Sequence, residues 1–485
     1  MSPEQNRVHG STRRMFLHRA GLAIAAGVLS PPTRFSGAKA FAASAPGDLS
    51  GASTLEFLRG IASATIESAR IRPGQSRSGY GPNTTGITLI SPGGNYPALW
   101  TRDFAMSLDC GLISAEEILP QFRLLARCQN GDKERHLPSG GIIPPFSIVD
   151  HVNLSGGAVF YPGTYSSGDD QGCPPWGPLP PADDHFYFVH IAHVLWKMLG
   201  QTGFLEEKIE GMSLFDRVER AFASPESDAK TGAIIATKER RAVGFGFQDS
   251  VYLQGAMSFA TLLRYRAAKQ LSELCRAKDR PRSAAKYEVI ARCIVANIER
   301  VFLLPAAQDG WLRAATEIGR QPDVWATLFA LHLGVLSRKS ATRARKTIAA
   351  AVRAPGNTVE YQGAIRHVPS DRYFKPGQCW ESGGTGVNTY QSGAFWHTPT
   401  GWLVEALQRV DSELAREVSD RFIEHLKGGD FRKGGAQGAP WECFGIKMAG
   451  AQNPVYMTSV TLPLAVLQGM IPKSGQRPDR TGGKK

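Results

Sequence analysis

Residues 95–106 have the sequence NYPALWTRDFAM, which places an aromatic ring, a cation and a carboxylate directly before an apolar helical segment. A flat ring such as that of Trp100 can cover the C–H face of a sugar, and Arg102 and Asp103 can form charge-assisted hydrogen bonds with its hydroxyls. Asp103 can equally cap a helix that begins at Phe104, because a carboxylate there accepts hydrogen bonds from free backbone N–H groups. The stretch therefore predicts a helix start and leaves a structural and a sugar-binding role open.

From about Ser53 onward, the chain alternates between two kinds of helical pattern. Segments of the first kind, such as 185–196, are apolar on almost every side and must be buried on most sides. Segments of the second kind, such as 412–426, have one apolar stripe and one charged face, so they cover a core and face water. This periodicity predicts roughly eleven or twelve helices in inner and outer pairs. Further examples are 324–335 and 400–407 of the first kind, and 282–301 and 338–353 of the second.

Long connections rich in Gly, Pro and aromatic residues separate several of these helices, and loops of this length in a compact domain usually serve a function. If the inner helices run parallel around a ring, their N-termini and these loops open on one face, where carboxylates and tryptophans converge. Such a pocket suits cleavage of a glycosidic bond, which needs a protonated acid, a carboxylate that activates water, and apolar faces for sugar rings. The loops are 72–99, 131–182, 355–391 and 428–456, with strand signals at 86–90 and 141–143. The carboxylates are Asp103, Asp183, Asp184, Asp249 and Asp323.

Three stretches occur in the order found in the six-hairpin glycosidases, a superfamily that includes glucoamylases, α-L-rhamnosidases and exo-acting mannosidases. Residues 96–103, YPALWTRD, resemble its Trp-x-Arg-Asp element. Residues 181–188, PADDHFYF, resemble its third-hairpin element with paired aspartates, and 390–396, YQSGAFW, resemble its late Gln-x-Gly element with a following Trp. The resemblance covers about residues 53–470. It implies an all-α fold, an (α/α)6 toroid of six helical hairpins with long loops and small β-hairpins on the active-site face, and a catalytic domain at 41–472.

The resemblance also implies roles for the residues that match. Arg102 and Asp103 would hold the hydroxyls of the terminal sugar. Asp184 would be the general acid, with Asp183 as a helix cap or an orienting neighbour.

The general base of the superfamily is a Glu in the last third of the chain. Glu442, within Pro-Trp-Glu-Cys-Phe before the last helical segment, resembles that residue, and Glu381 is its rival. The substrate-binding residues expected on these grounds are Trp100, Arg102, Asp103, Asp183, Gln391, Trp396, Trp441 and Glu381.

These features predict a glycoside hydrolase, exo-acting and inverting, that cleaves an oligosaccharide or polysaccharide with two carboxylates and without a cofactor. Two other classes stay open. A polysaccharide lyase on the same toroid would abstract a proton with Tyr390, Tyr373 or His397 beside Arg102, and its unsaturated product would absorb ultraviolet light. A non-catalytic glycan-binding protein would release no sugar.

The N-terminus resembles a bacterial twin-arginine export signal. Arg13 and Arg14 precede a short apolar run at 21–29, and small residues favour cleavage after Ala40. Residues 1–40 are therefore predicted to be a signal peptide that engages the twin-arginine translocation machinery. After cleavage we expect a soluble periplasmic or secreted protein without stable membrane insertion.

The net charge of +13 is concentrated at the two ends of the chain. Residues 1–40 carry +5 and residues 473–485 carry +4, which leaves only +4 for the body between them. A body charge this small does not predict a nucleic-acid partner. The Gly-rich basic tail 473–485 is expected to be disordered and solvated.

Histidine and cysteine patterns give no signal for a metal. His190 and His193 are three residues apart, but they lie in an apolar segment without an HExxH motif, which is typical of core histidines. The seven cysteines show neither CxxC pairs nor zinc-ligand spacing, so they predict no disulfide framework and no metal site.

The export signal makes the first testable prediction. Replacing Arg13 and Arg14 together by Lys should leave the precursor in the cytoplasm, because lysine does not reproduce the paired guanidinium geometry that the receptor recognises. Cell fractionation with an antibody against the protein measures this. Normal delivery of the double variant to the periplasm would contradict the assignment.

Overall fold

The computed structural model describes residues 52–172, 177–305, 310–374, 380 and 385–470 of the 485-residue chain. Its contacts divide the chain after Gly47, and every described element belongs to the second unit, Asp48–Lys485. The predicted signal peptide 1–40, the tail 473–485 and the predicted site residue Glu381 lie outside the described residues.

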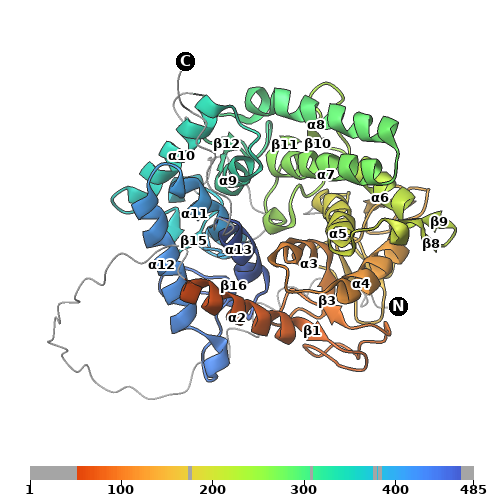
Figure 1. Ribbon diagram of the computed structural model, residues 1–485, viewed down its shortest axis with the longest axis horizontal. Coiled ribbons are helices and arrows are strands. Elements are labelled where there is room, and N and C mark those ends of the chain that lie inside the picture. The colour runs from red at the N-terminus through yellow and green to blue at the C-terminus, as the bar shows by residue number, and fades with distance from the viewer. Residues whose placement is uncertain (1–51, 173–176, 306–309, 375–379, 381–384, 471–485) are drawn as a thin grey trace, which may run out of the picture. The chain divides into compact units, whose positions relative to one another are not determined.

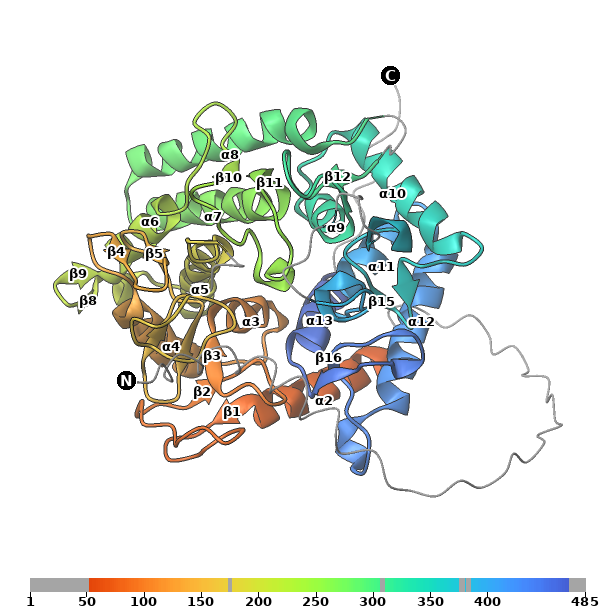
Figure 2. The ribbon, with the colours of Figure 1, turned by 180° about the vertical axis from the view of Figure 1, so that it is seen from behind.

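The described part of the chain contains twelve α-helices, six of which form an inner ring (Figures 1 and 2). The inner helices are α3 (Thr101–Met106), α5 (Asp183–Leu199), α7 (Ser258–Ala277), α9 (Val324–Leu333), α11 (Thr400–Gln408) and α13 (Thr458–Gly469). The outer helices are α2 (Ala52–Ala69), α4 (Ala115–Cys128), α6 (Leu214–Ala223), α8 (Pro281–Phe302), α10 (Arg338–Arg353) and α12 (Ser412–Gly428). Each inner helix contacts the next, and α13 contacts α3, so the ring closes. The predicted (α/α)6 arrangement of helical hairpins is confirmed.

The two predicted kinds of helix differ in burial as expected. In α9, all residues from Val324 to Leu331 are buried. In α12, burial is confined to one stripe that includes Leu414, Val418 and Phe422. Burying an apolar side chain of this size contributes about 1.5–3 kcal/mol relative to leaving it exposed. The inner helices are therefore stabilised by burial on nearly every side, and the outer helices by one face alone.

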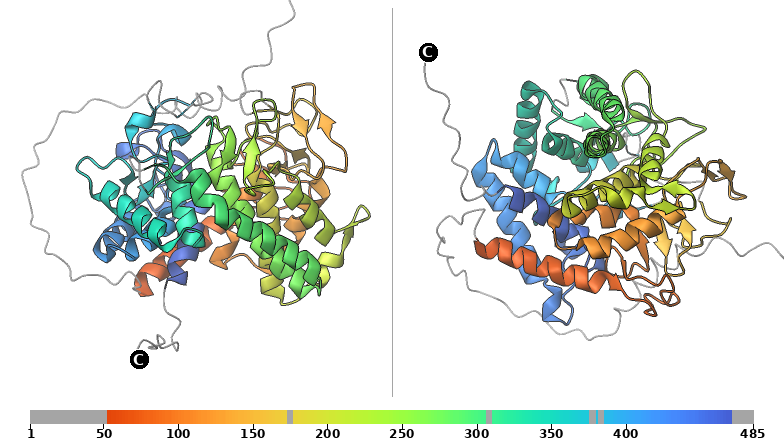
Figure 3. Two further views of the ribbon diagram at one scale, coloured as in Figure 1. Left: turned by 90° about the horizontal axis from the view of Figure 1, so that it is seen from above. Right: turned by 45° about the vertical axis from the view of Figure 1, so that its right-hand side comes forward.

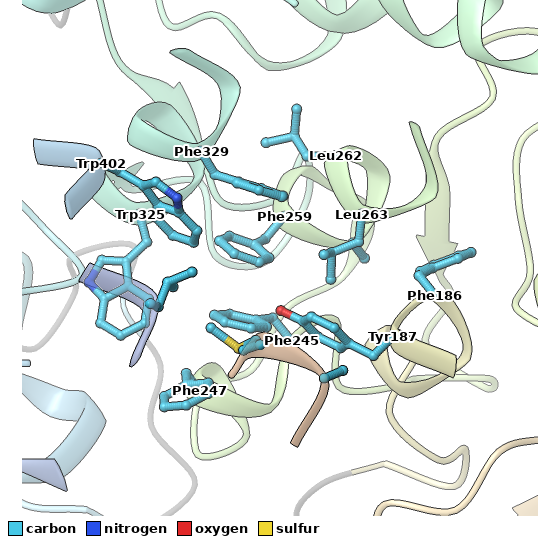
Figure 4. Close-up of a cluster of buried hydrophobic side chains, with 14 of the residues drawn as sticks. Phe186, Tyr187, Phe245, Phe247, Phe259, Leu262, Leu263, Trp325, Phe329 and Trp402 are labelled. Atoms are coloured by element: carbon cyan, nitrogen blue, oxygen red, sulfur yellow. The ribbon is translucent and has the colours of Figure 1, made fainter. Parts of the chain in front are cut away.

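Aromatic rings fill the interior between the inner helices (Figure 4). The ring of Phe259 in α7 stacks on Phe245 with the ring centroids 3.8 Å apart, and on Phe329 of α9 at 5.1 Å. Trp402 of α11 lies 4.9 Å from Phe329. Because Phe245 lies in the loop before α7, this stack anchors that loop to the core.

The strands form small antiparallel sheets within the connections. Three of them end directly before inner helices: β3 (Ala98–Trp100) before α3, β11 (Gly255–Met257) before α7, and β13 (Pro322–Asp323) before α9 (Figure 3). β3 pairs with β6 (His151–Asn153), which places Trp100 opposite His151. The predicted strand signals at 86–90 and 141–143 contain β2 (Leu89–Ile90) and β5 (Ile142–Ile143). Strands and long loops thus gather at the N-terminal ends of the inner helices.

The remaining strands pair as two-stranded hairpins, apart from β7, which extends the β3–β6 sheet. They are β1 (Arg70–Ile71), β4 (Arg135–His136), β7 (Ala158–Val159), β8 (Lys208–Ile209), β9 (Met212–Ser213), β10 (Ile234–Ala236), β12 (Leu312–Arg313), β14 (Glu360–Tyr361), β15 (Ala364–Ile365), β16 (Trp441–Cys443) and β17 (Gln452–Pro454).

Within the described ranges, no helix is long and apolar enough to cross a membrane. The same ranges hold no group of three or more His, Cys, Asp or Glu side chains that could bind a metal ion. His190 and His193 point to different carboxylates, Asp109 at 3.2 Å and Glu273 at 3.1 Å. The five cysteines among the described residues are unpaired: Cys110, Cys128, Cys275, Cys293 and Cys443.

Candidate active site

A single buried guanidinium holds three carboxylates at the N-terminal ends of α3 and α5. Arg102 Nη2 donates hydrogen bonds to Asp150 Oδ1 at 2.6 Å and to Asp184 Oδ2 at 2.8 Å, and Arg102 Nε donates to Asp183 Oδ2 at 3.0 Å. Burial raises the pKa of Asp184 well above its ordinary value. The positive charge of Arg102 lowers this pKa, and the negative charges of Asp183 and Asp150 raise it.

Asp150 links this cluster to the aromatic side chain of Trp100. Its Oδ2 lies 2.7 Å from His151 Nδ1, and the His151 ring stacks on Trp100 with the centroids 4.4 Å apart. The ring of Tyr96 meets Trp100 edge-on at 4.8 Å, and the ring of Tyr165 does so at 5.8 Å. One face of Trp100 is thus covered by histidine, and Trp100 is buried. The predicted sugar platform is packed within an aromatic cluster.

The loop before α7 reaches the same cluster through Gly246. Its backbone N–H donates a hydrogen bond to Asp183 Oδ2 at 2.9 Å. A Cβ atom at Gly246 would lie only 1.9 Å from Arg102 Nε, far closer than such atoms approach. Glycine is therefore required here because the guanidinium occupies the space of a side chain.

Asp103 does not cap a helix, in contrast to the structural alternative suggested by the sequence. The helix α3 begins at Thr101, and Asp103 lies inside its first turn. Its Oδ1 accepts a hydrogen bond from the Tyr456 hydroxyl at 2.5 Å. Burial raises the pKa of Asp103 to about 6, against the effects of Tyr456 and Arg102.

Glu442 occupies β16 and is held by two donors. The Tyr96 hydroxyl donates to its Oε1 at 2.8 Å, and Asn453 Nδ2 donates to its Oε2. Only 2% of Glu442 is exposed. Burial raises its pKa to about 8, the two donors lower it, and the charges of Asp103 and Asp249 raise it further.

Asp249 is the carboxylate whose importance the sequence did not reveal. It follows the 3₁₀ helix η4 (Gly246–Gln248), and its charge raises the pKa of Glu442. The sequence pattern placed Asp249 among the converging acids without a role. Its electrostatic influence on Glu442 could not be inferred, because it depends on the closure of the ring.

The other predicted site residues fall into two groups. Trp396 is fully buried among Phe247, Trp325 and other rings, so the substrate-binding role predicted for it is not supported by its position. Gln391 is also fully buried. Trp441 is partly exposed beside Glu442, where it can meet a ligand.

The predicted convergence of acids is visible in hydrogen bonds between hairpins. Asp323 caps α9 by accepting from Ala326 N at 2.9 Å, and it also accepts from Gln248 Nε2 at 2.9 Å. Asp183 contacts the same loop through Gly246. The carboxylates before α5 and α9 are therefore both tied to the loop that carries Asp249.

Comparison with solved structures supports the fold. The GH63 mannosylglycerate hydrolase from Thermus thermophilus, in complex with glucose, matches with a TM-score of 0.51 at 14% identity, over 84% of this chain and 99% of that chain. A rhamnosidase from Klebsiella oxytoca with rhamnose bound matches with a TM-score of 0.50 at 12% identity, over 86% of this chain and 64% of that one. No protein-family model and no curated protein matches the sequence. At these identities the likeness shows the fold alone, and that fold is the six-hairpin toroid.

Proposed function

We propose that this protein is an exo-acting, inverting glycoside hydrolase in which Asp249 is the general acid and Glu442 the general base. One observation carries the proposal: a buried carboxylate, Glu442, is held by two donors, and the charges of Asp103 and Asp249 raise its pKa. Two carboxylates on different hairpins, one to protonate the leaving oxygen and one to activate water, are what inverting hydrolysis requires. The partly exposed rings of Tyr96 and Trp441 supply apolar surface for a sugar.

This assignment replaces the expected acid, Asp184. Its Oδ2 accepts a hydrogen bond from Arg102, so Asp184 is engaged in the ion pairs of that guanidinium. Asp249 instead lies in the loop that leads to α7, and its charge raises the pKa of Glu442. We assign Asp183 and Asp184 to holding Arg102, and Arg102 to joining the ends of α3 and α5.

The hydrogen bonds around Glu442 favour its role as the base. Asn453 Nδ2 can only donate, and it also lies 3.3 Å from the Tyr96 hydroxyl. A hydroxyl that accepts from Asn453 directs its own proton to Glu442, so both oxygens of Glu442 act as acceptors. This arrangement suits an ionised carboxylate. Since the base and acid lie on different hairpins, we expect a carboxyl separation of roughly 6.5–9.5 Å, the inverting range.

The lyase alternative finds less support in the geometry. Arg102, its charge-neutralising cation, is surrounded by three carboxylates. Of the three expected bases, His397 is fully buried with Nε2 3.0 Å from the Gln362 carbonyl oxygen, Tyr373 is buried, and Tyr390 is partly exposed. A non-catalytic glycan-binding protein remains an outcome of the experiments below.

Two further parts of the proposal concern substrate and location. The matched structures are a mannosylglycerate hydrolase and a rhamnosidase, so we propose a small terminal glycoside as substrate. Residues 1–40 are proposed to export the chain by the twin-arginine route, which would place the enzyme where it meets extracellular glycans.

The two catalytic roles can be separated by substitution. Asp249→Asn and Glu442→Gln should each lower kcat by about 10²–10⁴-fold, the usual contribution of a general acid or base. Asp184→Asn, the matched control, should lower kcat by less than about tenfold, because the amide keeps the size of the carboxyl and its oxygen still accepts from Arg102 Nη2. NMR of sugars released from a glycan panel measures turnover.

A glycosyl fluoride needs no protonation of its leaving group, so it should restore activity to Asp249→Asn and not to Glu442→Gln. An inactive Asp184→Asn together with an active Asp249→Asn would return the acid role to Asp184. Binding without turnover in the wild type would indicate a glycan-binding protein.

The raised pKa of Glu442 predicts the pH dependence of activity. A base must be ionised, so kcat/KM should fall as pH drops through the pKa of Glu442, which lies near 8 and above the usual value of 4.5. The Tyr96 hydrogen bond lowers that pKa, so Tyr96→Phe should move the acid limb of the profile to higher pH. Tyr287→Phe, which loses a hydrogen bond to the remote Glu219, should leave the profile unchanged. An acid limb with its midpoint near pH 4.5 that does not shift in Tyr96→Phe would contradict the assignment.

A further inference from the structure

The side-chain amide of Gln391 forms hydrogen bonds with the loop that carries Asp249, both before and after that residue. Gln391 Oε1 accepts from Ser250 N at 2.7 Å and from Ser250 Oγ at 2.8 Å, and Gln391 Nε2 donates to the Gly246 carbonyl oxygen at 3.2 Å. Ser250 directly follows Asp249, and Gly246 precedes it by three residues. Because Gln391 is fully buried, its contacts are with this loop, and the expected substrate-binding role gives way to another.

The loop depends on such contacts because it belongs to no sheet or long helix. Between β10 and β11 it forms only the short η4, and Asp249 follows η4 without being part of a strand. Its first part is held by Asp183, which accepts from Gly246 N, and by Asp323, which accepts from Gln248 Nε2. Gln391 adds two hydrogen bonds to Ser250, directly after Asp249, where Ser250 Oγ also lies 3.4 Å from Thr385 Oγ1.

The segment around Gln391 is also joined to the strand of Glu442. Gln391 lies in the 3₁₀ helix η7 (Tyr390–Ser392), and four residues later Phe395 forms a two-way backbone bridge with Phe444. Phe395 N donates to Phe444 O at 2.8 Å, and Phe444 N donates to Phe395 O at 3.0 Å. Phe444 follows Glu442 by two residues. The segment 391–395 therefore contacts both the loop that carries Asp249 and the strand that carries Glu442.

We propose that Gln391 is a positioning residue that sets the place of Asp249 relative to Glu442, a role that rests on the proposed function of this pair. The amide is suited to this task because it accepts two hydrogen bonds from Ser250 and donates one to Gly246. A carboxylate at this position would keep the acceptors and lose the donor, and an aliphatic side chain would lose both.

The test compares Gln391→Leu and Gln391→Glu. Gln391→Leu should lower kcat by about 10–10²-fold, the scale of a displacement of about 1 Å in a catalytic group, with KM changed less than about twofold. Gln391→Glu should retain more activity, because it keeps the contacts with Ser250. Gln270→Leu is the matched control: this buried glutamine contacts His190 and not the loop, so its loss should lower the unfolding temperature and spare kcat.

A second readout does not require activity. The charge of Asp249 raises the pKa of Glu442, so Asp249→Asn should lower that pKa, measured by NMR of ¹³C-labelled glutamate carboxyls. Gln391→Leu should lower it in the same direction, because Asp249 is no longer held in place, whereas Gln270→Leu should not.

The outcomes separate the two claims. A rise in KM at constant kcat would make Gln391 a substrate contact, and an unchanged pKa of Glu442 in Gln391→Leu would also overturn the proposal. Full activity of Asp249→Asn and Glu442→Gln would instead overturn the proposed function, while the pKa of Glu442 would still show whether Gln391 positions Asp249.

Discussion

The structure depends on one buried cation, Arg102, and on the three carboxylates that it holds together. Asp150, Asp183 and Asp184 come from a loop and from the start of α5, and Gly246 of a further loop reaches Asp183 beside them. Removing one partner of a buried ion pair costs about 3–5 kcal/mol, because the remaining charge stays uncompensated. The cluster therefore fixes two inner helices and two loops in one arrangement at the open end of the ring.

Burial and an excess of carboxylates over cations raise the pKa values of two acids around this cluster. Arg102 forms ion pairs with three acids, so Asp103 and Glu442 lie in surroundings with more negative than positive charge. Burial raises the pKa of Asp103 to about 6 and that of Glu442 to about 8, and neighbouring acids add to the shift of Glu442. Carboxylates whose pKa values are moved toward neutrality are the groups that exchange protons with a substrate at physiological pH.

Sequence periodicity was enough to predict the helices, because buried and half-buried helices differ in pattern, as in 324–335 and 412–426. Glu442 was predicted from the resemblance of residues 440–444 to the late Glu element of the superfamily, and the structure places it beside Tyr96 and Asn453. The acid was harder to predict, because Asp184 at the start of α5 and Asp249 in the loop before α7 both lie at the N-terminal end of an inner helix, and the local sequence does not show which of them faces Glu442. The burial of Gln391 and Trp396 likewise follows from tertiary packing, which no local pattern contains.

Proton NMR of the first product is the most direct test of two-carboxylate hydrolysis on this toroid. A glycoside of known anomeric configuration is cleaved by the wild-type protein, and the anomeric proton is observed before mutarotation. The account predicts an inverted first product, because water attacks from the side opposite to the leaving group. A first product of retained configuration would contradict it, since retention requires a covalent intermediate formed by a carboxylate next to the anomeric carbon.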